Sequence, residues 1–352
     1  MEKGMLKMTT SLHLRRKREL LASALFWSGS SHVVSRLPEQ DSLVILNYHR
    51  IGNADDDPFL TEMFSATADQ FHDQVSCLKR SASLVSLEEA LAFADGTIKE
   101  KSRRLRVLIT FDDGYLDNYE IAFPILRSYG VEGVFFLATS MVGSSQIPWW
   151  DRIAYLIRNS RKRRFTLRYP TELTVNLDQN SLAESLEAVL DLYKGPRNSD
   201  PTQFIRELEE QTRAREIPNT SRRFLSWEEA REMTRCGMKI GSHTHSHTVL
   251  SQLSPAQQLE ELTKSGTILK ERLGAKAEVL AYPVGSRHSF NDETKRIARE
   301  AGYRAAFSFY GGTNQRANTS PYDIKRIFIG PQSLRRFNVQ TKFCRHLGKF
   351  WP

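Results

Sequence analysis

The sequence predicts an α/β fold in which parallel strands and helices alternate around a barrel. Short apolar runs recur along the chain, amphipathic stretches separate most of them, and 352 residues suffice for one large α/β domain. Short continuous apolar runs are typical of strands that are buried on both faces. Strands that alternate with helices form a parallel sheet with right-handed crossovers, and seven or eight such units close into a barrel.

The predicted strands are apolar runs of the length that buried strands have. In a barrel, the carboxyl ends of the strands meet at one rim, where active sites lie. Polar residues that directly follow a strand are therefore expected to converge there. The predicted strands are Leu43–Tyr48, Val107–Phe111, Val134–Ala138, Met238–Ser242, Val279–Tyr282, Arg304–Phe309 and Ile324–Ile329.

Helical periodicity and helix-end residues lie between the strands. Gly130 is typical of a helix stop. Ser254 and Pro255 provide an N-cap and a first-turn proline for a helix that ends at Gly274. The apolar faces of three predicted helices consist of Phe71, Val75 and Leu78; of Tyr119, Ala122, Phe123 and Leu126; and of Leu259, Leu262, Gly266, Leu269 and Leu273.

One barrel with additions is the predicted domain organisation. Residues 41–335 form the barrel, and residues 143–225, where the strand–helix rhythm breaks, form a helical insertion on it. Residues 1–40 are predicted to be an N-terminal helical segment and residues 336–352 a C-terminal tail. The apolar run at residues 20–27 is too short to span a bilayer, so an amphipathic helix that packs on the domain or rests on an anionic membrane is expected there.

Composition and charge limit the classes of function. A net charge of +9 favours acidic partners such as phospholipid headgroups, nucleic acid or anionic glycans. No RRM, zinc-finger or helix-turn-helix pattern supports nucleic acid. Cys77, Cys236 and Cys344 lie far apart, which argues against a disulfide framework and allows a reducing compartment. A cytoplasmic or peripheral membrane location is expected, and a secreted or periplasmic one is the alternative.

Two histidines four residues apart follow the predicted strand Met238–Ser242. His243 and His247 can turn both rings toward one ion, and imidazole suits zinc and neighbouring divalent metals. The spacing alone is a modest signal, because three histidines in a polar loop are the simple alternative. His245, between the two, is expected to point away from the ion, since neighbouring side chains cannot all converge.

Two consecutive carboxylates follow the predicted strand Val107–Phe111. Asp112 and Asp113 end an apolar run, where unpaired buried charge is expensive. One explanation is that either residue caps the helix that starts near Asn118. A division of labour explains both: Asp113 completes a metal site with the two histidines, and Asp112 accepts a proton from the metal-bound water, whose pKa zinc lowers toward 7.

The two motifs together resemble those of the polysaccharide deacetylases, family four of the carbohydrate esterases. Residues 110–114 read Thr-Phe-Asp-Asp-Gly and residues 243–247 read His-Thr-His-Ser-His. The resemblance covers residues 41–142 and 222–330. It implies a distorted (β/α)7 barrel, a divalent metal that is usually zinc, and hydrolysis of the N-acetyl group of an amino sugar. In that scheme Asp112 is the catalytic base, and the metal ligands are Asp113, His243 and His247.

The later motifs depart from the family pattern. Residues 281–285 read Ala-Tyr-Pro-Val-Gly, so the arginine that would orient the base is absent. The Pro-x-Gly turn can still present a backbone N–H near Tyr282 to the oxyanion. The Asp-Trp pair of the fourth motif is missing from residues 303–318, and the fifth motif lacks the histidine that would protonate the departing amine. Arg326 is a candidate replacement for the arginine as partner of Asp112.

His49 is the predicted general acid. It follows the first strand, and strand ends share one rim of a barrel, so its side chain can enter the pocket. The pair Tyr48-His49 is similar to the Tyr-His pair that ends the first strand in the poly-N-acetylglucosamine deacetylase branch. A histidine bonded to loop backbone is the alternative interpretation. His288, in the context of an exposed loop, is a weaker candidate for the acid.

The insertion begins with two tryptophans and continues with a basic cluster. Trp149 and Trp150 are suited to stacking on sugar rings, and packing of the insertion onto the barrel explains them equally well. The basic residues at 158–168 and 15–18 are typical of solvated faces. The functional interpretation of both clusters is contact with anionic lipid or with a lipid-linked pyrophosphate sugar.

The sequence thus predicts a hydrolase, a metal-dependent carbohydrate deacetylase with zinc as the expected metal. Its expected partners are an N-acetylated glycan or lipid-linked saccharide as substrate and an anionic membrane at its periphery, with no nucleic acid. Removal of another small acyl group, such as formyl, from a lipid-linked sugar is the enzymatic alternative. A catalytically silent glycan- or membrane-binding protein on the same scaffold is the other alternative, against which the four intact motif residues argue.

Overall fold

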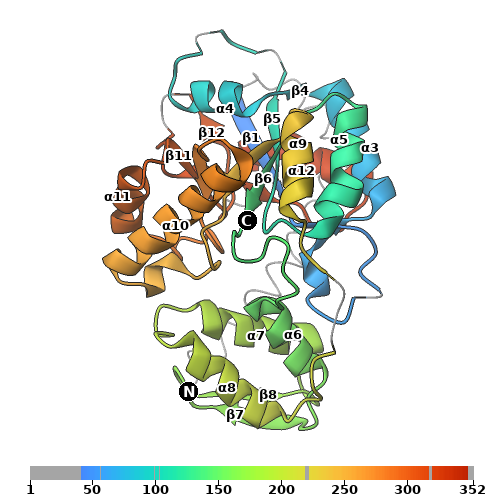
Figure 1. Ribbon diagram of the computed structural model, residues 1–352. Coiled ribbons are helices and arrows are strands. Elements are labelled where there is room, and N and C mark those ends of the chain that lie inside the picture. The colour runs from blue at the N-terminus through green and yellow to red at the C-terminus, as the bar shows by residue number, and fades with distance from the viewer. Residues whose placement is uncertain are drawn as a thin grey trace.

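The computed structural model describes residues 41–347 except 56, 99, 103, 219–221, 317 and 318. The predicted N-terminal helical segment, residues 1–40, lies outside the described residues. Most of the described chain forms a barrel, and the insertion lies at one end of it (Figure 1). Among these residues, no helix has both the length and the hydrophobicity needed to cross a bilayer.

The barrel is a mostly parallel sheet whose strands follow the apolar runs of the sequence. Each of the first six predicted strands is present within one residue of its expected bounds. Neighbours in this series pair in parallel, and their order in the sheet follows their order in the chain. They are β1 (Ser42–Tyr48), β5 (Arg106–Phe111), β6 (Gly133–Leu137), β9 (Lys239–Ser242), β10 (Val279–Ala281) and β11 (Ala305–Ser308).

The last predicted strand, Ile324–Ile329, is divided because it changes partners. β13 (Ile324–Lys325) pairs with β11, whereas β14 (Ile327–Phe328) pairs with β1. Arg326 stands between the two pairings with a side chain that is 0% exposed. The change of partner joins the last strand of the series to the first. Counted over the described residues, the ring has seven positions, which makes it the distorted (β/α)7 barrel that the sequence predicts.

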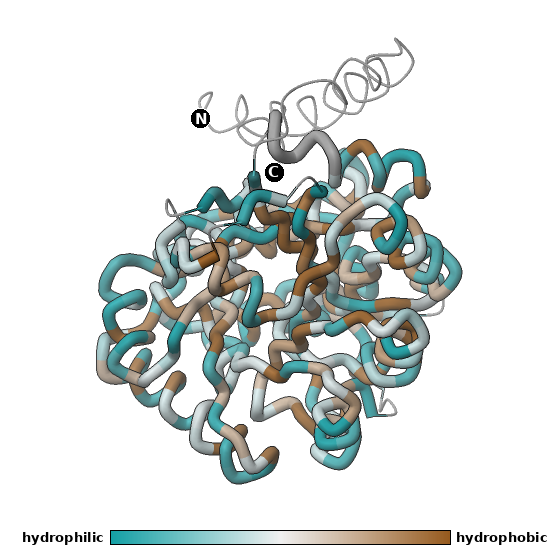
Figure 2. The backbone as a smooth tube through the Cα atoms, turned by 90° about the horizontal axis from the view of Figure 1, so that it is seen from above, coloured by the Kyte–Doolittle hydropathy of each residue, from teal (hydrophilic) through white to brown (hydrophobic). Residues whose placement is uncertain are grey.

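Strand alternation sorts the side chains into the barrel interior and an outer layer. Ile45, Leu108, Phe136 and Phe307 belong to the interior cluster, together with apolar residues of α4 (Leu87–Ala94). The alternate residues of the same strands pack against the surrounding helices. Figure 2 shows hydrophobic segments gathered in the middle of the molecule and hydrophilic ones around it. Because side chains alternate along a strand, a residue two positions after an interior residue also faces inward.

Helices cover the outside of the barrel. α10 (Pro255–Leu273) has its predicted ends: Ser254 accepts a hydrogen bond from the Gln257 N–H, and Gly274 has a φ of 76°. Its apolar stripe is narrower than predicted, because Leu259 is 38% exposed. The other outer helices are α3 (Ala68–Ser81), η2 (Asn118–Ala122), α5 (Phe123–Ser128), α9 (Trp227–Arg235) and α11 (Asp292–Glu300).

The described part of the predicted C-terminal tail belongs to a helix. α12 (Leu334–Leu347) buries Phe337, and Asn338 Oδ1 accepts a hydrogen bond from Cys77 Sγ of α3 at 2.7 Å. These contacts hold the end of the described chain against the barrel. The remaining short elements are β2 (Arg50–Ile51), η1 (Thr61–Met63), β3 (Phe64–Ala66), β4 (Ser83–Leu84), η3 (Leu250–Gln252) and β12 (Asn314–Gln315).

The insertion has an apolar cluster of its own. Ile153, Val189 and Leu208 belong to this cluster, which continues into the barrel loops through Tyr115 and Phe224. The sequence analysis expected a helical insertion and missed a β-hairpin, because the strands of the hairpin are short and partly exposed. The elements are α6 (Trp149–Arg158), β7 (Arg164–Leu167), β8 (Leu173–Asn176), α7 (Leu182–Lys194) and α8 (Pro201–Thr212).

The barrel interior accommodates no side chain at Gly241 of β9. A Cβ at this position would lie 2.5 Å from Phe136 Cδ1 and 3.1 Å from Val279 Cγ2. We expect Gly241→Ala to lower the free energy of unfolding by about 1–3 kcal/mol through overpacking. Gly266→Ala is the matched control, because its Cβ would lie 3.5 Å from the Tyr303 hydroxyl and alanine favours the helix. Urea denaturation measures both, and equal stability of the two variants would contradict the expectation.

Candidate active site

The carboxyl ends of neighbouring strands bring the predicted site residues together. Asp112 and Asp113 follow β5, and His243 follows β9. Ligand atoms of Asp113, His243 and His247 lie within 4.8 Å of one another, and all three residues are buried. The structure therefore collects, in one place, the three side chains that the sequence analysis named as metal ligands.

The donor set around Asp113 fits a divalent cation. His243 Nε2 and His247 Nε2 lie 3.5 Å and 3.2 Å from Asp113 Oδ1. Asp113 is 1% exposed, and neither of its carboxylate oxygens accepts a well-formed hydrogen bond from the described residues. A buried carboxylate without donors is costly to the fold. One carboxylate and two imidazoles that face one another provide the ligand types that zinc and related ions prefer.

The orientation of His243 suits a metal ligand. Its Nδ1 lies 2.8 Å from the Ala281 carbonyl oxygen, so Nδ1 carries the hydrogen and donates it. The lone pair on Nε2 is then directed toward Asp113. Burial lowers the pKa of His243 to about 4, although the charge of Asp112 opposes this shift. The ring is therefore neutral at physiological pH, as metal binding requires.

Two of the three candidate ligands have an unusual backbone conformation. Asp113 has a φ of 72° and His247 a φ of 57°, in the left-handed region that residues other than glycine rarely adopt. Such strain persists only where the surroundings impose it, and it is common at functional sites. The surroundings here include Thr244 Oγ1, which accepts from the His247 N–H at 3.1 Å, and Glu261 of α10.

Glu261 is a supporting residue that the sequence analysis missed. Its carboxylate accepts hydrogen bonds from the backbone N–H groups of His245 and Ser246, at 3.1 Å and 2.8 Å, and from the Ser246 hydroxyl. These bonds hold the loop that carries both candidate histidine ligands. In the sequence Glu261 is one of several glutamates in a helix, so no pattern distinguishes it.

Asp112 has the opposite environment from its neighbour, because donors saturate it. Arg326 approaches with two nitrogens, Nη1 at 2.6 Å from Oδ1 and Nη2 at 2.9 Å from Oδ2, and Asn47 Nδ2 donates to Oδ2 at 3.0 Å. Burial raises the pKa of Asp112, but the charge and hydrogen bonds of Arg326, together with the nearby His243 and His49, outweigh it and hold this pKa well below its ordinary value. Arg326 thus occupies the position predicted for the partner of Asp112, and Asp112 does not serve as a helix cap.

His49 lies at the same rim, between two phenylalanines. Its ring centre is 5.6 Å from that of Phe309 and 6.5 Å from that of Phe328. Its backbone N–H donates to Ser65 Oγ and its carbonyl accepts from Asn118, whereas its ring Nδ1 is buried without a partner. Burial lowers the pKa of His49, and the nearby charges of the two aspartates oppose that shift. The backbone of His49 is therefore anchored, and the described contacts do not tie its ring to the loop.

The other two histidines of the sequence analysis lie away from the ligand group. His245 Nδ1 lies 3.0 Å from the Thr139 hydroxyl, so its ring turns from the other two, as predicted. His288 lies in an exposed loop. Neither residue belongs to the buried group that could hold a metal.

Trp150 packs the insertion against the site. It is 3% exposed, its Nε1 donates to the Tyr115 hydroxyl at 2.7 Å, and its ring centre lies 4.3 Å from that of His247. Of the two interpretations in the sequence analysis, packing describes Trp150. Trp149, beside it, remains partly exposed.

A buried cluster of charges also joins the insertion to the barrel. Arg223 lies 3.0 Å from Asp151 and 3.3 Å from Asp57. Arg50 pairs with Asp57 and lies 2.9 Å from Asp117. Arg50 directly follows His49, and Asp151 directly follows Trp150. The cluster therefore fixes the backbone beside two residues of the site, and sequence patterns gave no indication of it.

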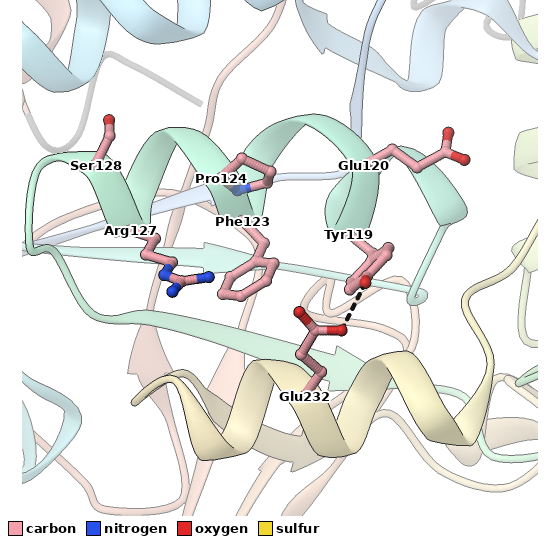
Figure 3. Close-up of a pocket in the computed structure, with 7 residues that line it drawn as sticks. All are labelled: Tyr119, Glu120, Phe123, Pro124, Arg127, Ser128 and Glu232. Carbon is pink, nitrogen blue, oxygen red and sulfur yellow. Dashed lines mark hydrogen bonds between the residues drawn. The ribbon is translucent and has the colours of Figure 1, made fainter.

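A separate groove lies on the outside of the barrel, between α5 and α9 (Figure 3). The side chains of Tyr119, Phe123 and Arg127 point toward Glu232 of α9, and the Tyr119 hydroxyl donates to Glu232 at 2.7 Å. None of the candidate site residues lines this groove.

Comparison with known proteins identifies the family. A family model described as polysaccharide deacetylase matches residues 99–306, which is more than half of the chain. The chain belongs to the polysaccharide deacetylase family. It is therefore a carbohydrate deacetylase of the hydrolase class, and metal dependence follows from the family together with the buried Asp113, His243 and His247.

Curated relatives and solved structures agree with this family. The deacetylase is 23% identical over 307 residues to the poly-β-1,6-N-acetyl-D-glucosamine N-deacetylase of Staphylococcus aureus (strain NCTC 8325 / PS 47), covering 83% of this chain and 80% of that protein. IcaB from Ammonifex degensii shares the fold at a TM-score of 0.55 and 20% identity, over 87% of this chain and 98% of that chain. The Streptococcus pyogenes deacetylase PplD has a TM-score of 0.56 at 20% identity, over 86% and 99%.

Removing one ligand of the deacetylase should remove the metal. We expect His247→Ala to reduce bound divalent metal from about one equivalent to near zero, since two ligands hold such an ion poorly. His245→Ala is the matched control, because this histidine lies in the same loop and bonds to Thr139 instead. Elemental analysis after dialysis measures both. Equal metal content in the two variants would contradict the assignment of His247.

Proposed function

We propose that this deacetylase removes the acetyl group from N-acetylglucosamine units of a β-linked polymer and that its metal is Zn²⁺. The observation that carries the proposal is the buried group of Asp113, His243 and His247 beside the Asp112–Arg326 pair. The polymer is inferred from the relative of S. aureus, whose name states that substrate. Zinc is inferred from the ligand types, one carboxylate and two imidazoles.

Asp112 acts as the general base. When bound, the divalent cation supplies Lewis acidity, which activates water and polarises the amide carbonyl. Arg326 and Asn47 hold the Asp112 carboxylate ionised and in a fixed orientation, so that it can accept a proton from the attacking water. Water adds to the carbonyl carbon, the C–N bond breaks, acetate leaves, and the amine requires a proton.

His49 supplies that proton. It lies at the rim, close enough to both aspartates for their charges to act on its pKa, and its ring Nδ1 has no partner among the described residues. The fifth family motif lacks its histidine here, which leaves the acid role vacant. His49 fills that role because strand order places it beside Asp112, on the strand next to β5.

The oxyanion donor is the N–H of Val284. Within the Pro-x-Gly turn, Pro283 has no N–H, and the Gly285 N–H donates to the Pro283 carbonyl at 2.6 Å. The Tyr282 N–H donates to the Phe307 carbonyl at 3.1 Å, so it is engaged in the sheet. Val284, with a φ of 63°, thus carries the remaining donor of the turn.

Acetate release tests the proposed activity directly. We expect the purified protein to release acetate from β-1,6-linked N-acetylglucosamine oligomers. Chelation should abolish this activity and Zn²⁺ should restore it, because the cation that Asp113 and the two histidines would hold activates the attacking water. Mass spectrometry detects the deacetylation as a decrease in the mass of the oligomers. Intact oligomers after incubation with the zinc-loaded protein would refute the proposal.

Replacing His49 separates the acid from the metal site. We expect His49→Ala to lower kcat by about 10²–10⁴-fold, the range of general acid–base catalysis, with unchanged metal content. His288→Ala, on an exposed loop, serves as the control and should retain kcat. A His49→Ala enzyme with a kcat near that of the wild type would exclude the role.

A further inference from the structure

Trp149 presents an aromatic face beside the site. Its ring stacks on that of Tyr193 from α7 with centres 4.3 Å apart, and it meets Trp150 edge-on at 5.2 Å. Both neighbours are buried, at 6% and 3% exposure, whereas Trp149 keeps part of its surface open. Its ring centre is 6.2 Å from that of His247, and its Nε1 donates to the His247 carbonyl at 3.4 Å. Trp149 is thus held by several contacts and remains partly exposed.

Phe328 presents a second aromatic face at the same rim. It belongs to β14 and is 38% exposed, which makes it one of three large hydrophobic side chains that the described residues expose. Its ring meets that of Phe309 edge-on at 6.0 Å and lies 6.5 Å from His49. The exposed part of Phe328 lies near the candidate acid, where a bound sugar unit can reach it.

The two aromatic rings lie beside different residues of the site. Trp149 is near His247, a candidate metal ligand, and Phe328 is near His49, the candidate acid. The reacting N-acetyl group has to lie against both histidines, since one belongs to the metal site and the other protonates the amine. Trp149 and Phe328 therefore border the place of the reacting sugar without occupying it.

We propose that Trp149 and Phe328 are stacking platforms for the sugar units that neighbour the reacting one, so that the enzyme selects a polymer over a single amino sugar. This inference rests on the proposed function. A pyranose ring presents C–H groups on its faces, and these pack on the electron-rich face of an aromatic ring. Rigid aromatic side chains provide such contacts at a small loss of conformational entropy.

Kinetics on oligomers of different length test the platforms. The probes are N-acetylglucosamine and its β-1,6-linked tetramer, and the readout is the ratio of their kcat/KM values. We expect Trp149→Ala and Phe328→Ala each to lower the tetramer-to-monomer ratio about tenfold, and the double variant about a hundredfold, because separate contacts add. Trp149→Phe retains an aromatic face and should restore most of the ratio.

Leu182→Ala is the matched control. Leu182 is 43% exposed and lies on α7, the helix that carries Tyr193, at the opposite end. It should keep the ratio of the wild type. Phe328 lies on the surface, so Phe328→Ala tests the proposal even where Trp149→Ala is poorly folded. Ratios at the level of the wild type in both alanine variants would overturn the platforms while leaving the deacetylase activity established.

Failure of the proposed function gives a different result. In that case the wild type releases acetate from neither the monomer nor the tetramer, and binding of the tetramer is measured instead of catalysis. Intrinsic tryptophan fluorescence of the metal-free protein is then titrated with the tetramer. Saturable binding that Phe328→Ala weakens about tenfold supports the platforms. Absence of binding by the wild type overturns them.

Discussion

A two-nitrogen ion pair between Arg326 and Asp112, inside the barrel, is the contact on which the architecture of the site depends. Arg326 stands where the last strand leaves β11 and joins β1, so the residue at the closure of the barrel also holds Asp112, the proposed base. Removal of one partner from a buried pair typically costs about 3–5 kcal/mol, because the other charge is left uncompensated. The residue at which the sheet closes therefore also supplies the positive charge that keeps Asp112 ionised.

The backbone conformation gives the two neighbouring aspartates, Asp112 and Asp113, different surroundings. Asp112 continues the alternation of β5 into the barrel interior, where Arg326 and Asn47 saturate its carboxylate. At Asp113 the backbone turns into the left-handed region, and the side chain reaches the two histidines without a well-formed hydrogen bond from the described residues. Protein donors stabilise one carboxylate, and the surroundings of the other suit a cation. The proposed base and the candidate ligand thus differ in their surroundings, although both are aspartates.

The sequence predicted what depends on local pattern. Apolar runs located six of the seven predicted strands to within one residue, and strand-end placement brought together Asp113, His243 and His247. Interactions between distant parts of the chain were harder to predict. Arg326 and Asp112 are 214 residues apart, and Arg326 was one candidate partner, supported by the lost family arginine and not by any spacing. Glu261 gave no signal at all, because a helix glutamate that binds loop N–H groups looks like any solvated one in the sequence.

The contacts of the insertion were also hard to predict from the sequence. These contacts show how the insertion supports the site. Its two ends meet at Tyr115: the ring of Phe224 stacks on that of Tyr115 at 5.0 Å, and Trp150 donates to its hydroxyl. Tyr115 follows the Asp112–Gly114 turn directly, and the Leu225 N–H donates to the Gly114 carbonyl at 3.0 Å. The insertion therefore braces the turn that carries both aspartates. The sequence analysis predicted only a helical insertion. The contacts that brace the turn come from Trp150 and Phe224, which are 74 residues apart in the chain and meet at Tyr115 in the fold.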